Sequence, residues 1–250
     1  MPSGKRRLPC AEPADAAEER VPADDAETPA AAYVDIATLL RSVAASLGVA
    51  PAAALRVYDP YYCRGSARAR LAAAGFPCVR NVDEDFYRTD AYARPAAAAA
   101  FDAVITNPPF SGAHIARALA WAARVPQPAL LLLPQHVARQ RAYFDFVAAL
   151  AARGHPAPLF VGPRAAAYAF DAPPGHVRQP GSFQCVWFCA LKQCTAAALE
   201  AWNAAAPPPA AALALGDPRR LPQLTLALRL TPAERRWRRK QRAAASAGSR

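Results

Sequence analysis

A short apolar run that stops at an Asn-Pro-Pro-Phe loop constrains the fold of this chain more than any other feature. Residues 101–106 read Phe-Asp-Ala-Val-Ile-Thr, and the loop begins directly after them at Asn107. An apolar run of this length, bounded by prolines, is typical of a buried strand. Pro108 and Pro109 fix two φ angles at about −65° and remove two N–H donors. The sequence therefore predicts a buried strand followed by a stiff loop rich in hydrogen-bond acceptors.

The loop has the groups that are needed to hold a planar amino group. The side-chain oxygen of Asn107 and the carbonyl of Pro108 can both accept a hydrogen bond from one NH2 group. These bonds draw the nitrogen lone pair out of conjugation with an attached ring, and Phe110 offers a face on which a flat base can stack. We expect the target site to consist of Asn107, Pro108, Pro109 and Phe110. A Pro-Pro turn without a binding role is the alternative.

A helix and a second strand are expected after the loop. Ile115, Leu119 and Trp121 fall near helical spacing, and residues 129–134 form another short apolar run that ends at a proline. Strand, loop, helix and strand in this order indicate an α/β fold whose loop lies at the carboxyl end of a strand, where ligands bind in open sheets. We therefore expect a single, mostly parallel sheet with helices on both faces.

The Asn-Pro-Pro-Phe tetrad resembles motif IV of the amino-methyltransferases that use S-adenosylmethionine, best known from the N6-adenine enzymes of DNA and RNA. Together with the later strand that ends in Leu-Leu-Pro, it is similar to compact phage-type adenine methyltransferases and to a family of uncharacterised algal and protist proteins. The resemblance implies a Rossmann-like class I methyltransferase that uses S-adenosylmethionine and methylates an exocyclic amino group, with adenine N6 favoured. The same tetrad serves enzymes that methylate guanine N2, cytosine N4 or a protein glutamine, so these acceptors remain open.

A second motif of this family is expected after the strand pattern of residues 55–58. Asp59-Pro60 occupies the place of motif I, the turn that holds the methionine end of the cofactor. Most relatives continue with a Gly-x-Gly, whereas here only Gly65 remains. Glycine at such a turn permits a positive φ and a close approach of the ligand. The resemblance implies that Asp59, Pro60 and Gly65 bind the cofactor; an ordinary strand-to-helix turn is the alternative.

The next short strand pattern, residues 78–82, leads into an acidic loop that ends in Asp85 and Phe86. Acidic side chains at this position can accept hydrogen bonds from ribose hydroxyls or from an adenine amino group. Asp85-Phe86 resembles the Asp-aromatic pair that holds the cofactor's adenine, and a solvated acidic loop is the competing interpretation. The stretch from Asp59 to Asn107 is shorter than in standard enzymes of this class. We therefore expect a strand or helix between the two motifs to be missing or shortened.

Composition excludes several classes of protein. With 250 residues, 54% of them apolar, the chain can form one α/β domain of ordinary size. We expect no membrane span, because no uncharged apolar run reaches about 18 residues, and no secretion, because the first residues lack an apolar core. The six cysteines and four histidines show no metal-binding spacing and no disulfide framework.

The chain divides into four segments: residues 1–32, an Ala-, Pro- and acid-rich segment expected to be disordered; 33–200, the methyltransferase-like domain; 201–230, a Pro/Ala-rich linker with a short appended element; and 231–250, a basic tail. An amphipathic helix is expected at residues 34–43, before the first strand. Alternating leucines at residues 224–230 predict a small added strand.

The basic tail predicts a nucleic-acid partner, RNA or DNA. Residues 234–242 carry six positive charges and one negative, out of a net charge of +11 for the chain. A basic run around a tryptophan suits phosphate binding with base stacking, or nuclear import. The expected contacts are Arg178, in a loop between the last strands, and Arg235, Arg236, Trp237, Arg238, Arg239 and Lys240.

Three alternatives to this assignment stay open. The basic run favours a location in the nucleus over the cytoplasm. The first alternative is that the tail only makes the protein more soluble and binds no nucleic acid. A protein glutamine methyltransferase would not need the tail. A catalytically silent nucleic-acid-binding module of the same fold would account for the single glycine at motif I.

Overall fold

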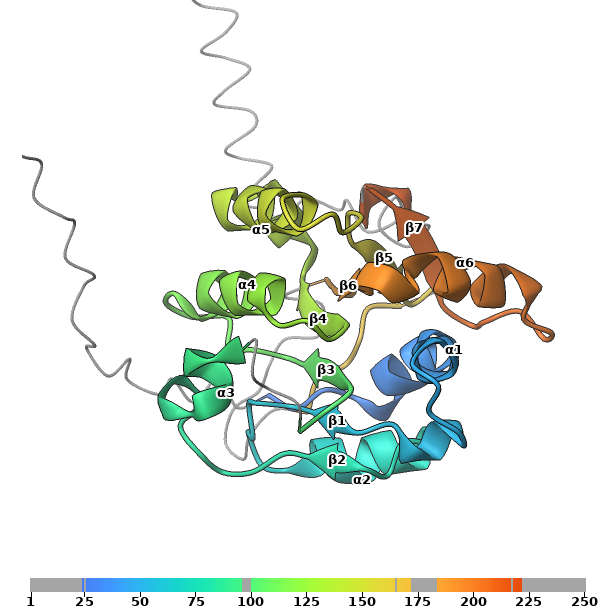
Figure 1. Cartoon of the computed structure of the whole chain (residues 1–250), viewed down its shortest axis with the longest axis horizontal. Helices are drawn as coiled ribbons and strands as arrows, with labels where there is room; N and C mark the ends of the chain where they lie inside the picture. Colours follow the sequence, from blue (N-terminus) through green and yellow to red (C-terminus); the bar gives the residue numbers. More distant parts are fainter. Residues whose placement is uncertain are drawn as a thin grey trace, which may run out of the picture.

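A seven-stranded mixed sheet lies at the centre of the fold (Figure 1). The computed structural model describes Asp24 and residues 26–95, 100–164, 166–171, 184–216 and 218–221. In chain order the strands are β1 (Val57–Tyr58), β2 (Val79–Arg80), β3 (Ala103–Thr106), β4 (Ala129–Pro134), β5 (Leu159–Gly162), β6 (Cys185–Ala190) and β7 (Ala212–Leu215). Their order across the sheet is β2-β1-β3-β4-β6-β5-β7. The first five strands of the chain run parallel, whereas β6 and β7 are antiparallel to them.

The two apolar runs on either side of the Asn-Pro-Pro-Phe loop form β3 and β4, as the sequence predicts. Every residue of both strands is buried. Burial on both faces is typical of a parallel sheet covered by helices, and it explains why the runs are apolar throughout instead of alternating with polar residues.

Helices cover both faces of the sheet, which confirms the predicted architecture (Figure 1). One face carries α1 (Ala30–Ser46), α2 (Ser66–Ala73) and α6 (Thr195–Ala204), and the other carries α3 (Asp90–Ala93), α4 (His114–Arg124) and α5 (Arg141–Ala151). Short 3-10 helices connect these elements: η2 (Ala52–Ala54), η3 (Phe86–Arg88), η5 (Gln135–Arg139), η6 (Lys192–Cys194) and η7 (Pro218–Arg220).

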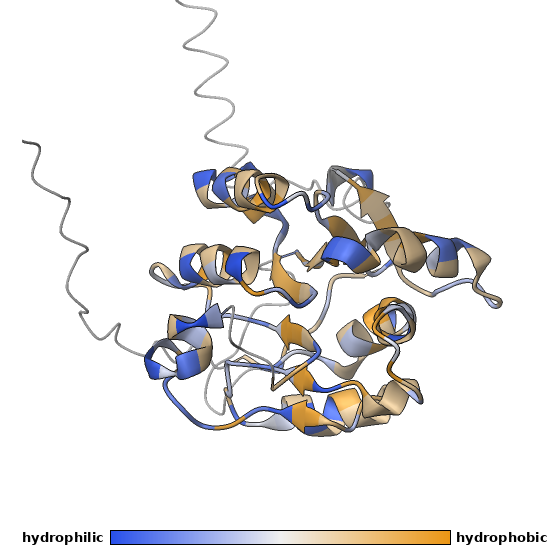
Figure 2. Cartoon of the chain, in the orientation of Figure 1, coloured by the Kyte–Doolittle hydropathy of each residue, from blue (hydrophilic) through white to orange (hydrophobic). Residues whose placement is uncertain are grey.

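Two layers of apolar side chains hold the helices to the sheet. Trp187 of β6 lies in the layer beneath α1, and Trp121 of α4 lies in the layer on the opposite face. Figure 2 shows the apolar residues concentrated in the strands, with hydrophilic residues gathered on helices such as α3. Among the residues that the structure describes, no helix combines the length and the apolar character that a membrane span needs.

The stretch between the two predicted motifs is short, as expected. Before β3, its described residues hold one strand, β2, which is two residues long and lies at the edge of the sheet. The helices α2 and α3 and the turn η3 complete this stretch. The parallel order β2-β1-β3 is kept, so the shortening leaves the ends of β1 and β3 side by side.

Described helices extend past the predicted segment boundaries at both ends of the domain, with α1 beginning at Ala30 and α6 ending at Ala204. The helix expected at residues 34–43 is α1, which begins at Ala30, and Glu27 already pairs with Asp171 through backbone bonds of 3.0 and 3.1 Å. The end of the segment expected to be disordered is therefore ordered, because it pairs with a residue far along the chain. The expected linker contains β7, which pairs with β5; the strand expected at residues 224–230 lies outside the described residues.

Phe188 tests the packing of the layer beneath α4 and α5. Its ring is fully buried and packs edge-on against Phe160, with 4.9 Å between centroids. We expect Phe188→Ala to lower the free energy of unfolding by about 3–5 kcal/mol, because it leaves a cavity that the sheet cannot close. The matched control is Phe144→Ala on α5, where the ring is 57% exposed, and its effect should stay within about 0.5 kcal/mol. Urea titrations of the wild type and the two variants measure both changes in the free energy of unfolding. Equal changes in the two variants would contradict the burial of Phe188.

Candidate functional site

The ends of β1 and β3 bring the two predicted loops together. The two strands are parallel neighbours, with Val57 opposite Ala103, so the loops that follow them leave the sheet at the same edge. The hydroxyl of Thr106, the last residue of β3, donates to Asp59 Oδ1 at 2.6 Å. The predicted cofactor turn and the predicted target loop therefore meet at one edge of the sheet.

Asp59 is a buried carboxyl without a cation beside it. Its side chain is 4% exposed, and both the Thr106 hydroxyl and the Tyr61 N–H, at 3.3 Å, donate to Oδ1. Burial raises the pKa of Asp59 to about 7, and the two hydrogen bonds oppose this rise only in part. Among the described residues no arginine or lysine forms an ion pair with it. Such a carboxyl is suited to a positively charged ligand group, whose charge would lower its pKa again.

The side chain of Asn107 is fixed at one end and unsatisfied at the other. Its Nδ2 donates to the Ala26 carbonyl at 3.3 Å. Its Oδ1 is buried and has no hydrogen-bond partner among the described residues. A buried acceptor without a partner costs about 1–3 kcal/mol. This oxygen is the atom that the sequence analysis expects to accept from the target's amino group.

Two residues of the turn after β1 have a left-handed backbone conformation. Gly65 has a φ of +83°, and Cys63 has a φ of +52°. A left-handed cysteine is uncommon and marks a turn that the surrounding structure imposes. Tyr62 lies over this turn, because a Cβ added at Gly65 would lie 2.8–2.9 Å from its ring and hydroxyl. The turn is thus shaped for close approach, but a tyrosine ring now fills the space beside Gly65.

Phe86, the aromatic member of the predicted adenine pair, is buried in the core. Phe86 is 3% exposed, and its ring packs edge-on against Tyr61 and Trp121 at 5.3 and 4.9 Å between centroids. Stacking an adenine on Phe86 would require this aromatic cluster to open, so the role expected from the sequence is not supported. Asp85 is exposed; it caps η3 and pairs with Arg88 at 3.3 Å.

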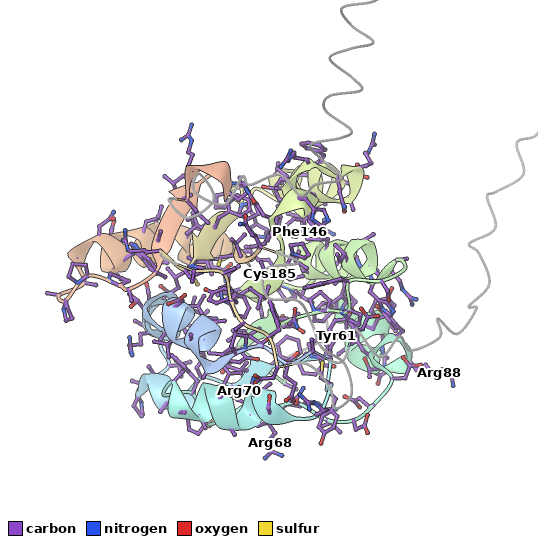
Figure 3. All side chains as sticks on the ribbon, turned by 180° about the vertical axis from the view of Figure 1, so that it is seen from behind. Tyr61, Arg68, Arg70, Arg88, Phe146 and Cys185 are labelled. Carbon is purple, nitrogen blue, oxygen red and sulfur yellow. The ribbon has the colours of Figure 1, made fainter. Side chains whose placement is uncertain are left out.

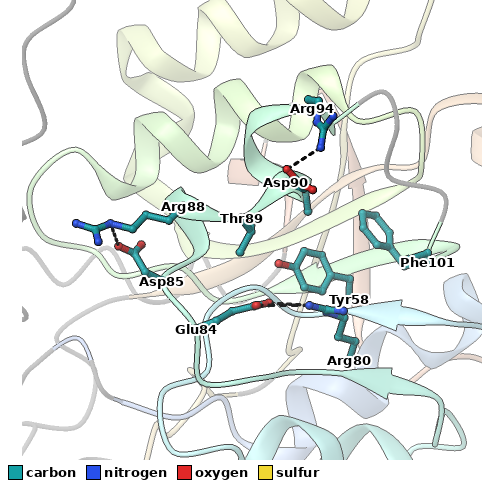
Figure 4. A pocket seen from close by; sticks show the side chains of 11 residues that line it. Tyr58, Arg80, Glu84, Asp85, Arg88, Thr89, Asp90, Arg94 and Phe101 are labelled. Carbon is teal, nitrogen blue, oxygen red and sulfur yellow. Dashed lines mark hydrogen bonds and ion pairs between the residues drawn. The ribbon is translucent and has the colours of Figure 1, made fainter.

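A cavity of about 860 Å³ lies beside Asp85 (Figure 4). The rings of Tyr58 and Phe101 lie at one side, and charged side chains from β2, η3 and α3 lie around them. Three ion pairs bridge the charged residues: Arg80–Glu84 at 3.1 Å, Arg88–Asp85 at 3.3 Å and Arg94–Asp90 at 2.8 Å. None of the lining residues belongs to the turn at Asp59 or to the loop at Asn107. The cavity and the two loops are separate features, and the candidate site is the pair of loops.

The end of the N-terminal segment lies across both loops, which the sequence did not indicate. The Asp24 carboxylate accepts from the Phe110 N–H at 3.1 Å, although 86 positions separate the two residues. The Glu27 carboxylate accepts at 3.0 Å from the N–H of Ser66, the first residue of α2. Composition cannot reveal such contacts, because they depend on the folded loops and not on any local pattern.

A chain of hydrogen bonds connects the turn after β1 to α4, and no pattern in the sequence indicated it. The Tyr61 hydroxyl lies 3.0 Å from the Tyr87 hydroxyl, which lies 2.6 Å from His114 Nδ1. The guanidinium of Arg117 lies over the Tyr87 ring, 3.5 Å from its centroid. Burial raises the pKa of Tyr61 well above its ordinary value, and the neighbouring Tyr87 adds to this rise. The phenol therefore stays protonated. Tyr61 is labelled in Figure 3, which views the molecule from the opposite side to Figure 1.

The remaining predicted contacts cannot be placed. Arg178 and the tail residues Arg235, Arg236, Trp237, Arg238, Arg239 and Lys240 lie outside the described residues. Within the described part of the chain, no three His, Cys, Asp or Glu side chains are grouped so that they could hold a metal ion.

Comparisons of the chain with models of known protein families, with curated proteins and with solved structures give no match. The function therefore has to be argued from the two loops, their buried polar groups and the sequence of the chain.

The raised pKa of Asp59 predicts an unusual dependence of stability on pH. Between about pH 4 and pH 7 the folded protein keeps a proton that the unfolded chain has lost, so the free energy of unfolding falls as pH rises through this window. We expect Asp59→Asn to remove this fall and to be more stable than the wild type at pH 8, by at most about 4 kcal/mol. Below about pH 4 the two proteins should be equally stable.

Urea titrations at pH 3.5, 6 and 8 measure this difference. Asp145→Asn, at a carboxyl on α5 that is 58% exposed and pairs with Arg141, is the matched control. A difference between Asp59→Asn and wild type that does not change with pH would contradict the raised pKa.

Proposed function

We propose that this chain is an S-adenosylmethionine-dependent methyltransferase that acts on an exocyclic amino group of nucleic acid, with adenine N6 favoured. The observation that carries the proposal is the buried Oδ1 of Asn107, which has no hydrogen-bond partner among the described residues, at the start of an Asn-Pro-Pro-Phe loop. The residue before it, Thr106, donates to the buried carboxyl of Asp59. An acceptor for an amino group and a carboxyl without a cation thus lie at adjacent strand ends.

The turn after β1 suits the methionine end of the cofactor. S-adenosylmethionine, when bound, supplies an electrophilic methyl group. Asp59 would pair with the ammonium of the methionine moiety, which gives the buried carboxyl the cation that it lacks. The positive φ angles of Cys63 and Gly65 let the backbone come close to a ligand. The Tyr62 ring has to turn away from Gly65 to open this space.

The loop after β3 suits the target. Asn107 Oδ1 and the Pro108 carbonyl would accept the two hydrogens of the amino group, which leaves its lone pair directed at the methyl group. Phe110 would stack on the base, and its ring is held edge-on by Phe170 at 6.5 Å. Catalysis then depends on positioning and on electrostatics.

The nucleic-acid part of the proposal rests on the sequence. Phe110 suits a flat base, and the basic run with its tryptophan suits a phosphate backbone. A glutamine side chain of a protein also presents a planar amide. The loop therefore supports a planar amino group as the methyl acceptor, and the choice of nucleic acid over protein depends on Phe110 and the basic run.

A second candidate function is a catalytically silent nucleic-acid-binding module of the same fold. Two observations favour it: the Tyr62 ring occupies the space beside Gly65, and Phe86 is buried in the core. Such a module would bind nucleic acid through the tail and would have no affinity for the cofactor.

Calorimetry with S-adenosylmethionine separates the two candidates. We expect micromolar binding to the wild type and a loss of at least about ten-fold in Asp59→Asn, because the buried ion pair with the cofactor cannot form. Asn107→Ala should still bind the cofactor but should lower the rate of methyl transfer to adenine-containing oligonucleotides by about 10²–10³. Asp145→Asn serves again as the control. An absence of binding at millimolar cofactor would overturn the enzyme proposal.

Deletion of residues 231–250 tests the substrate class. For a nucleic-acid enzyme, we expect the truncated chain to bind oligonucleotides more weakly and with a smaller dependence on salt, because fewer phosphates are neutralised. S-adenosylmethionine binding should not change. Full activity of the truncated chain on a glutamine-containing peptide, with none on oligonucleotides, would instead support the glutamine enzyme.

A further inference from the structure

Asp24 and residues 26–28, which we call the strap, lie across both loops of the candidate site. At the target loop the Asp24 carboxylate accepts from the Phe110 N–H at 3.1 Å, from the Ser111 N–H at 3.3 Å and from the Ser111 hydroxyl. The next described residue of the strap, Ala26, accepts from Asn107 Nδ2 at 3.3 Å. The strap therefore uses four donors of the loop that is expected to hold the target.

The strap also occupies the cofactor turn. Glu27 is 8% exposed, and its Oε1 accepts from the Ser66 N–H at 3.0 Å, at the start of α2. Its Oε2 lies 3.1 Å from Arg64 and 3.9 Å from Arg70. A carboxylate with a helix N-terminus and two arginines fills a favourable position for an anion. An anionic group of a ligand can reach these donors only after Glu27 leaves them.

The strap accepts hydrogen bonds from the donors of the site but offers nothing to its acceptors. In the part of the chain that the structure describes, Asn107 Oδ1 has no hydrogen-bond partner, and the strap brings no cation to Asp59. A ligand that carries an ammonium and a carboxylate, together with a target amino group, would satisfy both kinds of group. The strap therefore covers the site but supplies neither a hydrogen-bond donor to Asn107 Oδ1 nor a cation to Asp59.

The strap is held to the domain by polar and backbone contacts, although Ala26, Glu27 and Thr28 are buried. It joins α1 at Pro29, which is extended with a φ of −67° and a ψ of 152°. Beyond this point it is held by the backbone bridge between Glu27 and Asp171 and by Arg70, which donates to the Thr28 carbonyl. Figure 3 shows Arg70 pointing toward the fold from α2, whereas Arg68 points away. None of these contacts belongs to the two apolar layers that hold α1 to the sheet.

We propose that the strap is an autoinhibitory element that closes the candidate site and has to leave both loops before ligands bind. The identity of the competing ligands, S-adenosylmethionine and an amino-group target, rests on the proposed function. The closure itself rests only on the contacts of the strap.

The double variant Asp24→Asn/Glu27→Gln tests the proposal in the full chain. Its matched control is Glu84→Gln/Asp90→Asn, which removes two carboxylates from surface ion pairs. Hydrogen exchange of the Ser66, Phe110 and Ser111 amides, measured by NMR without ligand, should become at least about ten-fold faster in the test variant and stay unchanged in the control. The affinity for S-adenosylmethionine should rise at least about five-fold, because a larger fraction of molecules is open.

Unchanged amide exchange would overturn the proposal, as would faster exchange with unchanged or weaker cofactor binding. If no protein binds S-adenosylmethionine at millimolar concentration, the proposed function fails, and the exchange rates alone decide whether the strap closes the site. Asp24→Asn alone leaves the Glu27 contacts at α2 intact. It should therefore speed exchange only at Phe110 and Ser111, which keeps the test valid if the double variant folds poorly.

Discussion

The hydrogen bond from the Thr106 hydroxyl to Asp59 holds together the two loops of the candidate site. It joins the ends of two parallel strands and sets the loop at Asn107 beside the turn that leads to Gly65. The bond stabilises the charged form of Asp59, yet burial still raises the pKa of this carboxyl to about 7. The fold therefore keeps a destabilising group at the position where two loops meet, and a ligand cation would relieve it.

Three local features oppose stability at this site. Among the described residues, Asp59 is buried without a cation beside it and Asn107 Oδ1 has no hydrogen-bond partner, and Cys63 is held at a positive φ. Groups that a fold keeps in spite of their cost are commonly functional. The strap compensates by satisfying the donors of the same loops. The proposed autoinhibition and the proposed enzyme thus share one physical basis, which is a site with more polar groups than the folded chain satisfies.

Much of the framework could be predicted, because its signals are local. The apolar runs predict β3 and β4, and the prolines predict the stiff loop between β3 and α4. The burial of Phe86 could not be predicted, since an aromatic residue after an acidic loop suits a ligand surface as well as a core. The left-handed Cys63 was also missed, because a cysteine gives no signal for positive φ.

By itself, the sequence determined that the two apolar runs at residues 101–106 and 129–134 become strands, and it placed an acceptor-rich loop at the end of the first. Hydrophobic periodicity and proline act over a few neighbouring residues, so they can be read without the fold. The tertiary structure alone decided what each side chain meets: Thr106 on Asp59, Phe86 in the aromatic cluster, and Asp24 on the loop 86 positions away. These contacts arise between distant segments only after the sheet has assembled, and no local pattern encodes them.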